Sequence, residues 1–141
     1  MRRWLVLLLG IVGCHAQAQM AAPWFTVHGN PLDATVDTVQ VDPVAIRTDG
    51  HLKTMNVRVS RAVQRFNWEK LPYRSYEARV VFNCRTRRAG YMFATFYSQP
   101  LWQGPPSAST DYAASPQPML FLDIEPNPTQ RIIRAACQAP G

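Results

Sequence analysis

The chain has 141 residues, 47% of them hydrophobic, and its formal net charge is +6 at pH 7. From this length we expect one domain with a sizeable core. The excess of Lys and Arg favours acidic partners, but no nucleic-acid-binding motif accompanies it, so we expect no nucleic-acid partner.

Residues 1–18 have the organisation of a secretory signal peptide. Arg2 and Arg3 form a basic start, and the nine-residue apolar segment 4–12 follows directly. That segment is too short for a transmembrane helix, which needs about 20 apolar residues. We therefore expect the protein to be exported, to the periplasm, the outer membrane or the cell surface.

The end of the leader has two interpretations. The A-Q-A pattern at residues 16–18 fits cleavage before Gln19, which leaves residues 19–141 as a freely soluble mature domain. Alternatively, the Ile-Val-Gly-Cys sequence at residues 11–14 resembles a bacterial lipobox, in which Cys14 is the candidate lipidation site. Only the second interpretation gives the protein a membrane contact.

Cys84 and Cys137 are the two cysteines that remain after the leader and Cys14 are set aside. In an oxidising compartment such a pair usually forms a disulfide. A zinc site is the competing interpretation, but the two cysteines are 53 residues apart, no CxxC is present, and only His28 and His51 could complete the ligand set. A lone reactive thiol does not suit an exported protein either. We predict a Cys84–Cys137 disulfide and no metal site.

Alternation of apolar and polar residues predicts the strands, at residues 24–28, 35–42, 51–63, 76–84 and 91–97. In the segment 76–84 the two-residue period turns Cys84 inward with the apolar side chains. Residues 64–72 and 98–118 are predicted as loops, with residues 107–112 as an alternative short edge strand.

A change of period near the C-terminus predicts a short helix. Asn127 and Gln130 have the spacing of a helix cap, in which the Gln side chain reaches back to the cap residue. Ile133, Ala136 and Cys137 then share one helix face, which would direct Cys137 to the core.

These elements predict an α+β fold in one domain. A small antiparallel β-sheet of about five to six strands carries a short C-terminal helix, which the Cys84–Cys137 disulfide clips to the sheet. The loop-entropy relation assigns such a 53-residue loop about 4 kcal/mol of stabilisation.

Arg85, Arg87 and Arg88 lie in the predicted turn after the strand 76–84. Two interpretations stay open: a docking patch for an acidic protein or polyanion, or a solvated hairpin turn whose charges keep a sheet end from aggregating. The loop residues Trp68, Trp102 and Tyr112 are similarly either interface anchors or partly buried under the loops.

Catalytic motifs are not evident in the sequence. His28 and His51 have acidic neighbours in the chain, but proximity in sequence does not bring acid and base groups within hydrogen-bond reach. No GxSxG, HExxH or phosphate-binding glycine loop occurs. We expect no enzymatic activity and no cofactor.

Several short motifs recur in an order that resembles the bacterial surface-adhesin protein E-like domain. They are Trp24, Val41-Asp42-Pro43, Asp49-Gly50, Tyr73-Arg74-Ser75, Phe82-x-Cys84, Tyr97-Ser98 and Ala136-Cys137. The resemblance covers about residues 24–137. It implies an antiparallel sheet with one C-terminal helix and a disulfide between them, display at the bacterial surface, and binding of host extracellular-matrix or plasma proteins.

The sequence and the resemblance together predict an exported, non-enzymatic binding module of the bacterial envelope or surface. Its expected partners are proteins, including host extracellular-matrix proteins, or acidic polymers. The alternative is a periplasmic inhibitor or an assembly accessory protein of the cell envelope.

Overall fold

The computed structural model describes residues 23–140. The predicted signal peptide, the cleavage before Gln19 and the lipidation at Cys14 lie outside the described residues. The elements in chain order are β1 (Phe25–His28), β2 (Thr38–Val41), β3 (Arg47–Asp49), β4 (Leu52–Phe66), β5 (Pro72–Asn83), β6 (Arg88–Tyr97), the 3-10 helix η1 (Pro100–Trp102), β7 (Pro106–Asp111), β8 (Gln117–Pro118) and α1 (Thr129–Gln138).

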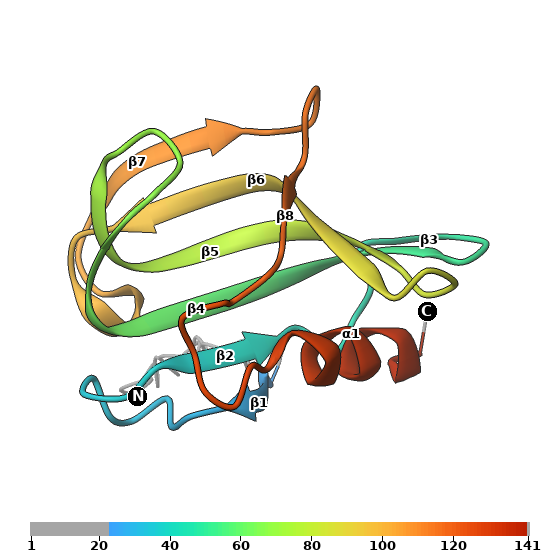
Figure 1. Cartoon of the computed structure of the whole chain (residues 1–141), viewed down its shortest axis with the longest axis horizontal. Coiled ribbons are helices and arrows are strands. Elements are labelled where there is room, and N and C mark those ends of the chain that lie inside the picture. Colours follow the sequence, from blue (N-terminus) through green and yellow to red (C-terminus); the bar gives the residue numbers. More distant parts are fainter. Residues whose placement is uncertain (1–22, 141) are drawn as a thin grey trace, which may run out of the picture.

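The strands form one antiparallel sheet with the continuous order β1-β2-β4-β5-β6-β7 (Figure 1). The short strands β3 and β8 lie off this path and pair with β4 and β6. The long strands β4, β5 and β6 follow one another through tight turns, which antiparallel pairing permits. The predicted fold class, an antiparallel sheet with one short C-terminal helix, is confirmed.

One face of the sheet carries the core. The buried side chains of β4 oppose those of β5 in register, as Met55↔Val80, Val57↔Ala78 and Val59↔Tyr76. Helix α1 packs on the same core, where Ile132, Ile133 and Ala136 are at most 1% exposed. A ten-residue helix is marginal on its own, so this packing is what holds it in place. Within residues 23–140, no helix has the length and apolar character that crossing a bilayer requires.

The start of α1 differs from the predicted cap. Pro128 itself occupies the N-cap position, and Asn127 Oδ1 accepts a hydrogen bond from the Thr129 amide at 2.9 Å. Gln130 does not reach back, because its Nε2 donates to the Arg87 carbonyl at 3.4 Å. The predicted cap, in which Gln130 reaches back to Asn127, is therefore wrong. The Asn127 side chain does satisfy one of the free backbone amides in the first turn of α1.

Several predicted strand boundaries need correction: β2, β5 and β6 begin at Thr38, Pro72 and Arg88, where the alternation predicted residues 35, 76 and 91. β4 continues to Phe66, because an irregularity in its pairing with β5 between Ser60 and Arg65 breaks the alternation that the prediction relied on. The predicted loop 64–72 therefore shrinks to residues 67–71. β3 and β8 were not predicted, so the sheet has eight strands where about five to six were expected. The edge-strand alternative for residues 107–112 is correct, since β7 covers most of that segment.

Residues 119–124, here called the strap, follow β8 and run across the sheet toward α1 (Figure 1). Their side chains alternate: Met119, Phe121 and Ile124 are buried, whereas Leu120 and Leu122 are exposed. The strap therefore contributes to the core with one side and presents apolar side chains to solvent with the other.

Candidate functional site

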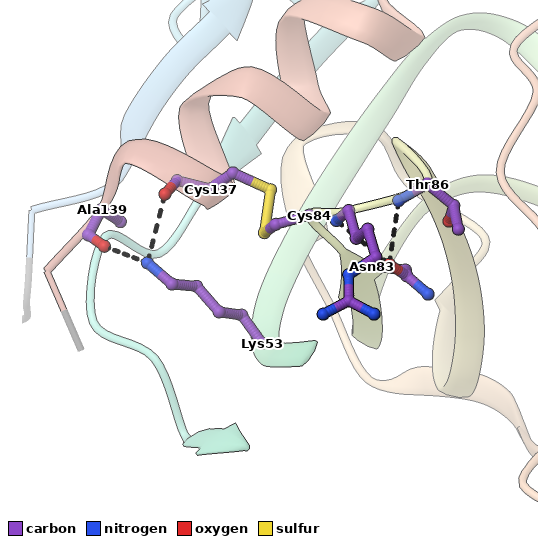
Figure 2. Close-up of a disulfide and its surroundings, with 7 residues drawn as sticks. Lys53, Asn83, Cys84, Thr86, Cys137 and Ala139 are labelled. Carbon is purple, nitrogen blue, oxygen red and sulfur yellow. Dashed lines mark hydrogen bonds between the residues drawn. A yellow bond between two sulfur atoms is a disulfide. The ribbon is translucent and has the colours of Figure 1, made fainter. Parts of the chain in front are cut away.

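The disulfide joins the end of the sheet to the last turn of the helix (Figure 2). Cys84 and Cys137 have Cα atoms 5.6 Å apart, so the predicted clip between helix and sheet is present. Cys84 lies one residue beyond β5, not within a strand as predicted, although its amide still donates to the His51 carbonyl at 2.8 Å.

Lys53 provides a second connection between the sheet and the C-terminal end of α1. Its Nζ donates to the carbonyls of Cys137, at 3.3 Å, and of Ala139 (Figure 2). A cation at a helix C-terminus satisfies free carbonyls and interacts favourably with the helix dipole. The C-terminal end of α1 is thus fixed covalently and electrostatically.

The arginine turn, defined as Arg85, Arg87 and Arg88, follows directly after Cys84. Asn83 organises it: its Oδ1 accepts from the amides of Arg85, at 3.1 Å, and Thr86, at 3.0 Å (Figure 2). The Arg87 amide donates to the Asn83 carbonyl at 2.9 Å, and Arg87 adopts φ of 59°. Arg88 begins β6, where the prediction placed it in the connection.

The three side chains of the arginine turn are exposed, and none forms an ion pair with an acidic residue among residues 23–140. Guanidinium groups in this state can pair bidentately with carboxylates or sulfates. The same observations fit a solvated hairpin turn, so both interpretations remain compatible with the geometry.

A cleft of about 390 Å³ lies between the strap and the β4–β5 loop, residues 67–71. Its floor is aromatic and comes from β5 and β6: Tyr73, Tyr76, Tyr91 and Phe96. These rings pack with centroid separations of 5.3 to 5.7 Å, within the range of favourable aromatic pairs. The volume lies within the range of binding pockets, and polar residues such as Arg61 and Lys70 share the lining with the aromatic rings.

Trp68 forms one wall of the cleft. Its ring lies 5.4 Å from that of Tyr91 and 5.3 Å from that of Tyr112, yet 45% of the residue is exposed. Tyr112 is buried and donates to Glu69 Oε2 at 2.9 Å. Trp68 is therefore both held in position and accessible, which suits an interface anchor.

Trp102, by contrast, covers the opposite face of the sheet. The Arg58 guanidinium lies between two indoles, 4.5 Å from the Trp24 centroid and 3.9 Å from that of Trp102. Arg58 Nε donates to Gln40 Oε1 at 2.7 Å, and desolvation lowers the pKa of Arg58. The Trp102 amide donates to the buried Ser75 Oγ at 3.0 Å. These contacts give Trp102 a structural role.

A buried cation lies beside the cleft floor. Arg61 is 4% exposed and pairs with Asp37, at 3.0 Å, and with Asp123 of the strap. Burial alone would lower the pKa of Arg61, but the neighbouring Tyr73, Asp37 and Asp123 outweigh it and raise that pKa. Asp123 also pairs with Arg65 at 3.2 Å, so these ion pairs tie the strap to β4.

The tyrosines of the floor stay protonated near neutral pH. Desolvation raises the pKa of Tyr73 and Tyr91, and raises that of Tyr76 most clearly. The floor therefore offers neutral hydroxyls and ring surfaces, which can bind an apolar group but do not supply a general base at this pH.

His28 lines the same surface hollow as Asp33 and Asp37, but within residues 23–140 its ring forms no ion pair or hydrogen bond with either carboxylate. His28 Nδ1 lies 3.3 Å from Arg131 Nη2, and burial, followed by that cation, lowers the pKa of His28. Across the described residues 23–140, no group of three or more His, Cys, Asp or Glu side chains could hold a metal ion.

Sequence reasoning missed the cleft. Its walls are the β4–β5 loop and the strap, which are about 50 residues apart in the chain and meet only because both cross the same face of the sheet. One signal for the cleft was present in the sequence: residues 119–122 are four consecutive large apolar residues, which is unusual for a surface loop.

The comparisons with known proteins gave one family. The family model described as Surface-adhesin protein E matches residues 24–138. No curated protein and no solved structure matches the chain significantly. The match covers all of the strands and α1.

Proposed function

We propose, because the chain belongs to the surface-adhesin protein E family, that it is an exported, non-enzymatic binding module of the bacterial envelope or surface. The observation that carries this proposal is the extent of the family match, which includes the disulfide cysteines Cys84 and Cys137 and every regular element of the fold. The family is one of adhesin-like surface proteins, so a binding role follows more directly than catalysis.

The proposal includes export by the N-terminal leader. Residues 1–18 act as the signal peptide and residues 19–141 form the mature domain, with lipidation of Cys14 as the alternative that tethers it. The intact mass decides between them: a mature N-terminus at Gln19 without acyl mass gives the soluble form. A diacyl or triacyl mass on Cys14 gives the lipoprotein, since a single chain binds membranes only marginally.

The proposed partners are proteins, including host extracellular-matrix proteins, or acidic polymers. The exposed arginine turn supports an acidic partner, because its guanidinium groups form no ion pair within the described chain and lie on an ordered turn. Charges of this kind raise association rates and make binding sensitive to salt.

Two measurements test the proposal. Protease treatment of intact cells should remove the protein from the surface, and the mature domain should bind immobilised matrix proteins or a sulfated polysaccharide in a saturable manner. Protection from protease together with capture of an envelope protein would instead support a periplasmic inhibitor or assembly accessory. Absence of saturable binding to all of these would contradict a binding module.

A further inference from the structure

The mouth of the cleft is unusually apolar for a surface. Phe66, Leu120 and Leu122 line it and are 64%, 50% and 76% exposed. Soluble monomers rarely gather large apolar side chains around one opening unless something binds there. Trp68, on the wall, adds a fourth exposed apolar side chain.

A buried donor at the cleft lacks a partner. Asn67 is 7% exposed and lines the cleft, and its Oδ1 accepts from the Leu71 amide at 2.8 Å. That bond fixes the orientation of the side chain, and leaves Asn67 Nδ2 with no acceptor among residues 23–140. Buried polar groups are nearly always hydrogen-bonded. Because Nδ2 is itself buried beneath the cleft lining, an acceptor that displaces the neighbouring loop atoms as it enters would complete this site.

Charge at the cleft is uneven. Arg61 and Arg65 are balanced by Asp37 and Asp123 next to the floor. The floor tyrosines are uncharged. Lys70, also on the lining, has no acidic partner within the described part of the chain. A ligand should therefore present an apolar group to the floor and a carbonyl or a carboxylate toward the β4–β5 loop.

From these observations we infer that the cleft binds an aromatic or large aliphatic side chain of a protein partner, with the adjoining backbone carbonyl accepting from Asn67 Nδ2. Any peptide provides this combination, because each apolar side chain is flanked by its own backbone carbonyl and by that of the preceding residue. An acidic residue flanking the apolar one would pair with Lys70. The inference deepens the proposed binding function by naming the chemistry of the partner.

The test uses minimal peptide mimics as probes. The isotopically labelled mature chain, with its disulfide intact, is titrated with N-acetyl-phenylalaninamide and, as the matched control, N-acetyl-alaninamide, and NMR shifts are followed. We expect saturable shifts of the Asn67 side-chain amide and the Trp68 indole with the first probe only. Equal responses to both probes, or shifts confined to residues outside the cleft, would overturn the inference.

Two variants sharpen the assignment. Asn67→Asp keeps the oxygen that accepts from Leu71 and removes the donor, so the dissociation constant should rise about fivefold, the loss typical of one neutral hydrogen bond. Leu122→Ser tests the mouth without threatening the fold, because that side chain is 76% exposed. Leu32→Ser is the control, since Leu32 is 90% exposed and does not line the cleft.

Leu122→Ser should weaken binding of the phenylalanine probe, and Leu32→Ser should not. Wild-type affinity for the probe in both Asn67→Asp and Leu122→Ser would refute the site. The outcome is separable from that of the proposed function. A mature domain that binds matrix proteins but not the phenylalanine probe leaves the binding function standing and removes the cleft from it. Binding of the phenylalanine probe without binding of matrix proteins would keep the cleft as a binding site and contradict the proposed binding of matrix proteins.

Discussion

The hydroxyls of Tyr76 and Tyr91 lie 2.6 Å apart on neighbouring strands, and each residue is at most 6% exposed. Their rings also meet edge to face, with centroids 5.7 Å apart. Each hydroxyl is the other's hydrogen-bond partner at the floor of the cleft. This pair places two polar groups in an apolar region without leaving either one unsatisfied.

Alkaline pH should destabilise the fold. Desolvation is the main cause that raises the pKa of all five tyrosines; it brings that of Tyr112 to about 12. Because these pKa values are raised in the folded state, the tyrosines of the unfolded chain lose their protons at a lower pH than those of the folded chain. The free energy of unfolding therefore falls as the pH rises above 10.0, the ordinary pKa of tyrosine. A spectrophotometric titration should show tyrosinate appearing above that pH, with the Tyr76 and Tyr91 signals coinciding with loss of near-ultraviolet circular dichroism. Ordinary titration of all five tyrosines in the folded protein would contradict this.

Tyr91→Phe should cost about 1 to 2 kcal/mol in the free energy of unfolding, because it leaves the buried Tyr76 hydroxyl without its partner. The double variant Tyr76→Phe with Tyr91→Phe removes both hydroxyls together. It should be less destabilised than the sum of the two single variants, which chemical denaturation would measure. Strict additivity would mean that the two hydroxyls do not interact in solution.

Much of the fold was predictable from local patterns. The β5–β6 hairpin follows from clean alternation around Val80, and the C-terminal helix from the face that Ile133 and Ala136 share. The extent of β4 was not predictable, because the irregularity after Ser60 shifts the register and hides the strand. The cleft was not predictable either, since it depends on contacts such as that of Asp123 with Arg61, 62 residues earlier.

Loss of the disulfide should destabilise the domain substantially. For the 53-residue separation of Cys84 and Cys137, loop entropy gives about 4 kcal/mol. Cys84→Ala should therefore lower the melting temperature markedly in thermal denaturation. Wild-type protein under reducing conditions should match the variant, and thiol labelling of the denatured, unreduced wild type should find neither cysteine free. An unchanged melting temperature in Cys84→Ala would show that the clip contributes little.

Arg61→Lys should destabilise the domain by about 2 kcal/mol, because one ammonium group cannot serve Asp37 and Asp123 together as the buried guanidinium does. The matched control is Arg65→Lys. That side chain is 39% exposed and has the single partner Asp123 in the described chain, so its change should cost under about 1 kcal/mol. Urea unfolding of both variants gives the comparison, and equal costs would indicate that burial of Arg61 is unimportant.

The arginine turn should act on the association rate and not on stability. Changing Arg85, Arg87 and Arg88 to Ser should slow binding to an acidic partner and flatten its salt dependence, because exposed charges act mainly on association. Stability should change by no more than about 0.5 kcal/mol, since these side chains are exposed and Asn83 still organises the turn. Association rates with the sulfated polysaccharide heparin, measured by surface plasmon resonance over a range of salt concentrations, provide the test.

Net charge alone could produce a similar slowing, so the control must remove the same charge elsewhere. Arg79, Arg131 and Arg134 are also exposed, and changing these three to Ser lowers the net charge equally. The turn acts as a docking site if its variant loses more association rate than this control at low salt. Equal losses would assign the effect to overall charge, and wild-type rates in both variants would leave residues 85–88 as a solvated hairpin turn.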